Sequence, residues 1–215
     1  MREYFDLELK ALNDKLIEMG ALVEGAIKNT ITIITNGEYD KLETSRIIEE
    51  KINTMEREIQ NYCLNLLLLQ SPVAGDLRTV SAALKMITDL ERIGDQCSDI
   101  AELSGYISRC SISHKLHLKQ MSECVIQMLD MAVLSFAESD LETARLVYAK
   151  DDEVDALFDK VKKEIISIIS KDDTDAELLV DLLMVSKYFE RIGDHAENIA
   201  EWVEYSITGD FVNAM

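Results

Sequence analysis

The sequence predicts an all-α protein made of two tandem, similar three-helix bundles. Turn-forming residues are scarce, with eight glycines and one proline among 215 residues, while 47% of the residues are hydrophobic. Apolar residues recur every three or four positions through long segments, which is the spacing of one helix face. In addition, residues 91–102 recur at 190–201 with eight of twelve positions identical. Such a repeat indicates one supersecondary unit used twice.

Three helices are expected in the first half. Apolar stripes run over residues 5–33 and 48–69 at alternating steps of four and three, so each stripe faces a partner helix. The single proline, Pro72, follows the second stripe and predicts a break there. Asp76 is predicted to be the N-cap of the third helix, whose apolar stripe runs over residues 86–100.

The second half repeats this order. Its first two apolar stripes run over residues 118–135 and 147–168. The polar residues 171–175 predict a break, and a third helix is expected from Ala176. Trp202, near the end of that helix, is expected to pack between the bundles.

The connection between the halves is expected at residues 104–114, which are rich in Ser and Gly and lose the helical periodicity. The first three-helix unit is therefore predicted at 1–108. The second unit is predicted at 109–215.

Charge excludes several classes of partner. The chain has 22 basic and 41 acidic residues and a net charge of −19, so nucleic acids and anionic lipid surfaces would repel it. No apolar run approaches the roughly 18 residues of a membrane span, and the first residues lack a signal-peptide pattern. We expect a cytoplasmic protein without nucleic-acid binding or membrane insertion. Its cysteines, which lack metal-ligand spacing, are expected to be buried and reduced: Cys63, Cys97, Cys110 and Cys124.

Two acidic ridges are the strongest candidates for chemistry. Each places three side chains at steps of four residues, so successive members drift by only about 40° around the helix axis. The ridges comprise Glu91, Asp95 and Asp99 in the first half and Glu190, Asp194 and Asn198 in the second. Like charges at this spacing repel, so a ridge beside a core needs a compensating cation. Arg92 and Arg191 point about 100° away from the ridges around the helix axis. The compensating positive charge is therefore expected to come from a neighbouring helix or a metal ion.

The second helix of each half supplies further ligands at the same spacing. An antiparallel helix pair would bring these side chains opposite the ridges and form one oxygen-rich metal site per bundle. The predicted sites are Glu49, Asn53, Glu91, Asp95 and Asp99 in the first bundle, and Asp151, Asp155, Glu190, Asp194 and Asn198 in the second. Each set has four carboxylates and one amide.

Carboxylate sets without thiols suit magnesium, manganese, calcium or iron better than zinc. Solvated helix faces are the competing interpretation. Gly94 and Gly193 recur inside the ridges at a cost of roughly 1 kcal/mol each, which favours close approach of a helix or a ligand. The sequence has no catalytic triad, phosphate loop or Glu-x-x-His di-iron motif at the ridges, so no catalytic residue and no organic cofactor site is predicted. His195 is expected at the surface or beside the site.

The chain resembles the PhoU family over nearly its whole length. The resemblance rests on MGALVE at 19–24, SPVAGDLR at 71–78, ERIGD at 91–95, DDEVD at 151–155 and ERIGDHAENI at 190–199. It implies two similar three-helix bundles that form a homodimer or a higher oligomer. It also implies multinuclear clusters of iron, zinc, manganese or magnesium at E/D-x-x-x-D motifs. These fall on Glu49 with Asn53, Glu91 with Asp95, Asp151 with Asp155, and Glu190 with Asp194; Asn53 departs from the acidic form.

The function that the resemblance implies is cytoplasmic negative regulation of phosphate uptake and of the phosphate-starvation response. It would act by contact with the ATPase subunit of the phosphate ABC transporter and with a sensor histidine kinase, and it would not be an enzyme. Two alternatives stay open. One is an acidic helical scaffold of another pathway that binds no metal, and the other is a carboxylate-bridged metallohydrolase.

Overall fold

The computed structural model of the protein describes residues 2–36, 38, 41–69, 73–107, 117–169 and 175–210. These residues contain six helices and no strand, which confirms the predicted fold class. The helices are α1 (Arg2–Asn36), α2 (Lys41–Leu69), α3 (Ala74–Ile107), α4 (Leu118–Glu138), α5 (Leu141–Ile169) and α6 (Ala176–Thr208).

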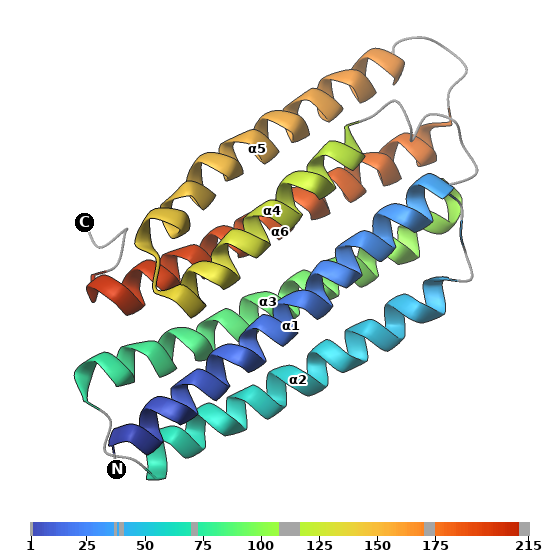
Figure 1. Cartoon of the computed structure of the whole chain (residues 1–215). Coiled ribbons are helices and arrows are strands. Elements are labelled where there is room, and N and C mark those ends of the chain that lie inside the picture. The colour runs from blue at the N-terminus through green and yellow to red at the C-terminus, as the bar shows by residue number, and fades with distance from the viewer. Residues whose placement is uncertain are drawn as a thin grey trace.

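The first three helices form one bundle and the last three form the other (Figure 1). The bundles lie side by side, with α3 against α6 and α1 against α4, while α2 and α5 lie on opposite flanks. Helices α3 and α6 run antiparallel and make the most extensive contact among the described helices. These two third helices therefore form the centre of the molecule.

The predicted apolar stripes meet in one continuous core that spans both bundles. Leu16 of α1, Ile52 of α2 and Ile93 of α3 are almost completely buried. Burying a side chain of this size stabilises the folded state by about 1.5–3 kcal/mol. Trp202 packs against the core from α6 and lies 5.8 Å from the Lys85 ammonium of α3, which confirms its predicted position between the bundles.

Local polar contacts determine where α3 and α6 begin. Asp175 accepts hydrogen bonds from the backbone N–H groups of Glu177 and Leu178 and therefore caps α6. The helix begins at Ala176, as predicted. The N-cap prediction for α3 is wrong by three residues. Helix α3 begins at Ala74, and Asp76 lies inside its first turn, where Oδ2 accepts from the Val73 N–H at 3.2 Å. This is the reciprocal bond of a capping box.

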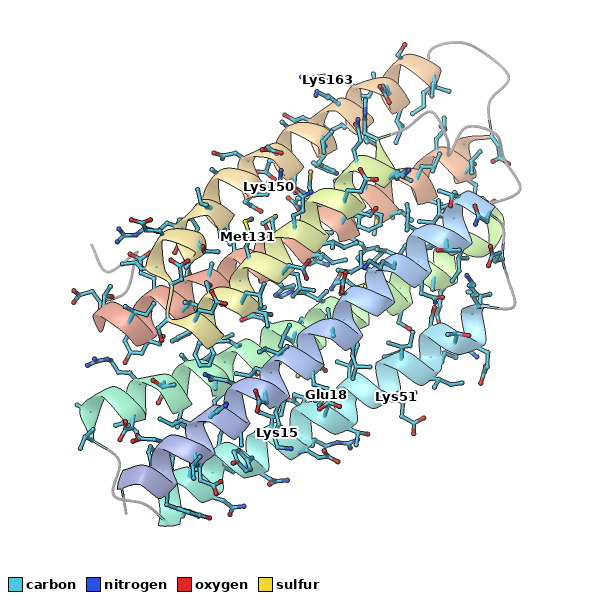
Figure 2. The ribbon with its side chains drawn as sticks, viewed as in Figure 1. Lys15, Glu18, Lys51, Met131, Lys150 and Lys163 are labelled. Atoms are coloured by element: carbon cyan, nitrogen blue, oxygen red, sulfur yellow. The ribbon has the colours of Figure 1, made fainter. Side chains whose placement is uncertain are left out.

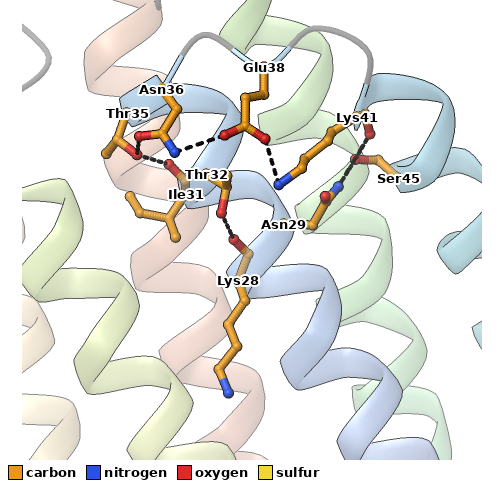
Figure 3. A network of polar contacts seen from close by, with 9 residues as sticks. All are labelled: Lys28, Asn29, Ile31, Thr32, Thr35, Asn36, Glu38, Lys41 and Ser45. Carbon is orange, nitrogen blue, oxygen red and sulfur yellow. Dashed lines mark hydrogen bonds and ion pairs between the residues drawn. The ribbon is translucent and has the colours of Figure 1, made fainter.

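The corner between α1 and α2 is joined by side chains on both helices (Figure 3). Asn29 of α1 donates to Oγ of the buried Ser45 at 2.7 Å and to the Lys41 carbonyl at 3.3 Å. Glu38 pairs with the Lys41 ammonium at 2.7 Å and accepts from Asn36 at 3.0 Å. These contacts bring the start of α2 back against α1.

The predicted connection at 104–114 is wrong for its first part, because α3 continues to Ile107. Ser104 is fully buried, and its hydroxyl donates to the Ile100 carbonyl at 2.6 Å, so a polar residue is accommodated inside the helix. Residues 108–114 and the domain boundary at 108/109 lie outside the described residues. So do Pro72 and most of the predicted break at 171–175.

Two of the four cysteines are buried as predicted. Burial raises the pKa of the Cys63 thiol to about 12 and also raises the pKa of Cys97. Cys124 differs, since it is only half-buried on α4. Cys110 lies outside the described residues. None of the helices described here is long and apolar enough to cross a membrane.

Candidate functional site

Each bundle carries a carboxylate cluster along the seam between its second and third helices. Cluster A comprises Glu49 and Asn53 of α2 with Glu91 and Asp95 of α3. Cluster B comprises Asp151 and Asp155 of α5 with Glu190, Asp194 and Glu197 of α6. In each cluster, burial and then the charges of neighbouring carboxylates on both helices raise the pKa of the central acids. The structure thus brings the predicted ridges opposite the predicted pairs on the second helices.

Glycine in the third helix permits this approach. A Cβ atom added to Gly193 would lie 3.0 Å from Oδ1 of Asp151, and one added to Gly94 would lie 3.0 Å from Cδ1 of Ile52. Few real Cβ atoms come so close to a neighbour, so a larger residue at either position would displace the Ile52 or Asp151 side chain of the second helix. The expectation of a close helix approach at both glycines is confirmed.

Cluster A is partly neutralised by its own chain. The Arg92 guanidinium lies 3.1 Å from Asp95 and 3.5 Å from Glu91, and Ser98 donates to Glu49 at 2.5 Å. The expectation that Arg92 points away from the ridge is therefore wrong, because its long side chain reaches back over the helix surface. Burial still raises the pKa values of Glu91 and Asp95, with repulsion between them and from Glu49 adding to the effect.

Cluster B is more acidic and less compensated. Its cation is Lys187, which forms an ion pair with Glu190. Burial, followed by the charges of Glu197, Asp155, Asp194 and Glu190, raises the pKa of Asp151 to about 7. Oδ1 of Asp151 is buried without a hydrogen-bond partner. Burial and neighbouring carboxylates also raise the pKa values of three further members, which are Asp155, Asp194 and Glu197.

Glu197 is a member of cluster B that the predicted ligand set does not contain. Its charge raises the pKa of Asp151 across the seam between α5 and α6. Seven residues turn a helix to within about 20° of the starting direction, so Glu197 lies almost in line with Glu190. Ser98 occupies the matching position of the first repeat and donates to Glu49 of cluster A, so this position faces the second helix in both bundles.

The outermost ridge positions, Asp99 and Asn198, also form contacts between α3 and α6, while the charge of Asp99 still contributes to the raised pKa of Asp95 after burial. Asn198 donates to Oδ1 of Asp89 on α3 at 3.3 Å, and Nδ1 of His195 lies 2.9 Å from the same oxygen. Asp99 accepts a hydrogen bond from Tyr188 of α6. Asp99 and Asn198 each follow the first ridge residue by eight positions, and eight residues rotate the side-chain direction by about 80°. This rotation turns both side chains away from the second helix of their own bundle and toward the seam between α3 and α6. The assignment of Asp99 and Asn198 to the two sets of ligands stays a prediction.

The described residues contain no group of three carboxylate, imidazole or thiol side chains positioned to hold a metal ion as they stand. Metal binding at cluster A and cluster B stays a prediction.

Two open grooves lie on other faces of the molecule. One, of about 600 Å³, runs between α1 and α2 past Lys15, Glu18 and Lys51 (Figure 2). The other, of about 410 Å³, runs between α4 and α5 past Lys150 and Cys124. Neither groove is lined by a member of cluster A or cluster B, so both are separate from the candidate site.

Comparison with known proteins gives a consistent result. The PhoU domain family matches residues 16–104 and again residues 118–203. A phosphate-specific transport system accessory protein PhoU homolog from Clostridium acetobutylicum is 33% identical over 99% of this chain and 98% of its own length. The corresponding homolog from Deinococcus radiodurans is 30% identical, with 97% of this chain and 99% of its own length covered.

Solved structures show the same similarity. The crystal structure of PhoU from Pseudomonas aeruginosa superposes with a TM-score of 0.88 at 29% identity, covering 96% of this chain and 100% of that one. The phosphate transport system regulatory protein PhoU from Streptococcus pneumoniae also gives a TM-score of 0.88, at 26% identity, covering 97% of this chain and 99% of that one.

Proposed function

Because the chain belongs to the PhoU family, we propose that it is a negative regulator of phosphate uptake and of the phosphate-starvation response. The observation that carries this proposal is the end-to-end similarity to proteins named as accessory or regulatory proteins of phosphate transport. As a member of a family of transport accessory proteins, the chain is not an enzyme.

The proposed mechanism is protein–protein contact in the cytoplasm. The partners are the ATPase subunit of the phosphate ABC transporter and the sensor histidine kinase of the response. Cluster A and cluster B support this mechanism because each concentrates more acidic than basic side chains on one helix seam. Such surfaces steer association with basic surfaces and select against acidic ones.

Metal binding at the clusters is the second part of the proposal. The residues of cluster B fit a hard divalent cation, since Oδ1 of Asp151 is buried without a partner and the surrounding donors are carboxylates. Asp151, Asp155, Glu190 and Asp194 would hold the ion in the second bundle. Glu49, Asn53, Glu91 and Asp95 would do so in the first bundle. Bound metal would supply positive charge that relieves the repulsion among these side chains.

Deletion of the gene tests the regulatory role. We expect phosphate-starvation genes to be expressed in phosphate-rich medium after deletion and to be repressed again by the wild-type gene. Repression that stays intact in the deletion strain would contradict the proposal.

The partner contact is tested by co-purification of the transporter ATPase subunit and the kinase with the tagged protein. We expect Asp155→Asn combined with Asp194→Asn to reduce recovery of at least one partner. Glu142→Gln on the same helix as Asp155 is the matched control, because Glu142 is exposed in the first turn of α5, more than two turns away from the members of cluster B on that helix. Equal recovery with all three proteins would exclude cluster B from the contact.

Metal content is tested by elemental analysis after purification without chelator. We expect bound metal in the wild-type protein and its loss when Glu91, Asp95, Glu190 and Asp194 are all changed to Ala. A wild-type protein free of metal would leave the clusters as docking surfaces alone.

A further inference from the structure

A small groove of about 260 Å³ opens between α1 and α4, which lie side by side and antiparallel where the two bundles meet (Figure 1). The buried Gly20 and Val133 face each other at its floor, where a Cβ atom added to Gly20 would lie 3.1 Å from Cγ2 of Val133. Ile17 of α1 and Leu134 of α4 form its edges and are 39% and 47% exposed. No member of cluster A or cluster B lines this groove.

The duplicated fold does not require an apolar groove here. The buried stripe of α1 at residues 16–33 recurs in α4 at residues 118–135. Under this correspondence, the counterparts of the two exposed edge residues are Lys119 and Thr32. The related end of the α1–α4 seam is therefore polar, and the exposed apolar pair is specific to the groove.

Acidic side chains lie one helical turn from the exposed leucine on both sides. Asp130 and Glu138 come four residues before and after Leu134, a spacing of about 6 Å along the helix axis. Burial, followed by the charge of Glu24 on α1, raises the pKa of Asp130, and Lys28 offsets this only in part because it forms an ion pair with Glu24. The groove is thus an apolar hollow with acidic ends.

These features identify the occupant by size, shape and charge. A volume of about 260 Å³ is below the roughly 300–1,000 Å³ of pockets that enclose drug-sized ligands, and it suits a side chain that protrudes from a partner. A groove along two antiparallel helices is an arrangement that receives the apolar face of a third helix. Its acidic ends attract basic residues, whereas they repel a second copy of this chain, which has a net charge of −19.

We propose that the α1–α4 groove binds a basic amphipathic helix of a partner protein. One large apolar side chain of that helix inserts between Ile17 and Leu134, and Lys or Arg residues one turn before and after it contact Asp130 and Glu138. The apolar side chain contributes most of the affinity, because a packed anchor at the centre of an interface dominates its energy. The basic residues orient the helix and accelerate association. This contact goes beyond the function proposed above, since it uses neither carboxylate cluster.

Fluorescence anisotropy with two labelled helical peptides tests the proposal. Both peptides have about 16 residues, with lysine four residues before and after the centre and alanine and glutamine elsewhere. The central residue is leucine in one peptide and glutamine in the other. We expect the wild-type protein to bind the leucine peptide about tenfold more tightly. Leu134→Gln is expected to remove this difference, and Asp130→Asn combined with Glu138→Gln is expected to weaken binding of both peptides by about tenfold.

The matched controls carry the same kinds of change on α5. Leu146→Gln alters a similarly exposed leucine, and Glu142→Gln combined with Asp152→Asn removes two exposed charges. Both controls are expected to leave the two dissociation constants unchanged, and thermal unfolding followed by circular dichroism identifies any variant that loses its fold. Equal binding of the two peptides by the wild-type protein, or equal effects of the α5 variants, would overturn the proposal. So would a Leu134→Gln protein that changes only the self-association of the chain, because a second copy would then occupy the groove.

Discussion

Single positions determine how crowded each carboxylate cluster is. Asp155 in cluster B replaces the neutral Asn53 of cluster A, and Glu197 replaces Ser98. Cluster A also receives the Arg92 guanidinium on two of its carboxylates. Cluster B consequently has more repulsion to relieve, so we expect an added divalent cation to stabilise cluster B more than cluster A.

Asp151→Asn is expected to stabilise the metal-free protein at pH 8. The pKa of Asp151 is about 7 in the folded state, above its ordinary value of 3.8, so the folded state disfavours the charged form. The free-energy cost of the charged Asp151 carboxylate is fully present above pH 7. It disappears as the pH falls from 7 toward 4, because the folded state binds the proton at a higher pH than the unfolded state does. After allowance for solvent screening of a half-exposed group, the gain in free energy of unfolding at pH 8 is about 1 kcal/mol.

Urea unfolding with chelator at pH 8 and pH 5 measures this effect. The gain is expected to be smaller at pH 5. Asp152→Asn, at the exposed neighbouring position, controls for a general reduction of negative charge. A destabilised Asp151→Asn protein at pH 8 would show that the carboxylate makes a favourable contact in the folded state.

Three glycines in helices provide a graded test of packing. A Cβ atom on Gly25 would meet nothing within 4 Å, whereas one on Gly94 would meet Ile52 at 3.0 Å. Gly25→Ala is therefore expected to stabilise the protein by up to about 1 kcal/mol. Gly94→Ala is expected to destabilise it by about 1 kcal/mol, because overpacking at roughly 1–3 kcal/mol exceeds the gain in helix propensity.

Gly193→Ala is expected to destabilise the protein as well and to displace Asp151 in cluster B. Chemical denaturation of the three variants measures the order of their stabilities. Stabilisation by all three substitutions would mean that α2 and α5 shift outward at little cost.

At the scale of elements, α5 and α6 are joined by a polar contact as well as by their apolar faces. The buried Glu204 of α6 accepts from Nε of Arg145 and from the Tyr148 hydroxyl, both at 3.1 Å. The hydrogen bonds from Arg145 lower the pKa of Glu204. At the other end of α6, the side chain of the N-cap Asp175 accepts from the first free backbone N–H groups of the helix.

Asp175→Ala is expected to lower the free energy of unfolding by about 1 kcal/mol, since two backbone N–H groups lose their acceptor. Glu177→Ala, in the same first turn, is the comparison and is expected to cost less, because it removes only a favourable charge near the helix N-terminus. Equal losses measured by thermal denaturation would mean that charge, and not the cap, stabilises this end.

At the scale of the whole molecule, the halves are joined by related contacts along the α3–α6 seam. Asp89 of α3 accepts a hydrogen bond from Asn198 of α6. Asp99, ten residues further along α3, accepts one from Tyr188, which lies ten residues earlier on α6. These positions correspond in the repeat, since Asp99 matches Asn198 and Asp89 matches Tyr188. The antiparallel pair thus relates the two bundles by an approximate twofold axis.

Asp89→Ala is expected to destabilise the protein by about 1–3 kcal/mol, because it leaves the half-buried side chains of His195 and Asn198 without their shared acceptor. Glu102→Ala is the control on α3, since Glu102 is exposed and lies 3.8 Å from Arg46. Both proteins are expected to unfold in one transition in urea. Two separated transitions in the wild-type protein would show that the bundles fold independently.

The sequence alone determined the helical class, the six helices, the duplication and the glycines at the close approaches. These features follow from periodicity and repetition, which are local properties of the chain. It also identified most of both clusters, because a step of four residues keeps side chains on one face of a helix.

Only the tertiary structure decided which side chains complete the clusters. A difference of one residue along α6 places Glu197 on the α5 seam and Asn198 on the α3 seam. Where a face points depends on the rotation of each helix against its neighbours, and the reach of Arg92 depends on what surrounds it. Packing across the whole chain sets both the rotation of each helix and the direction of the Arg92 side chain. The local residue pattern therefore does not predict them.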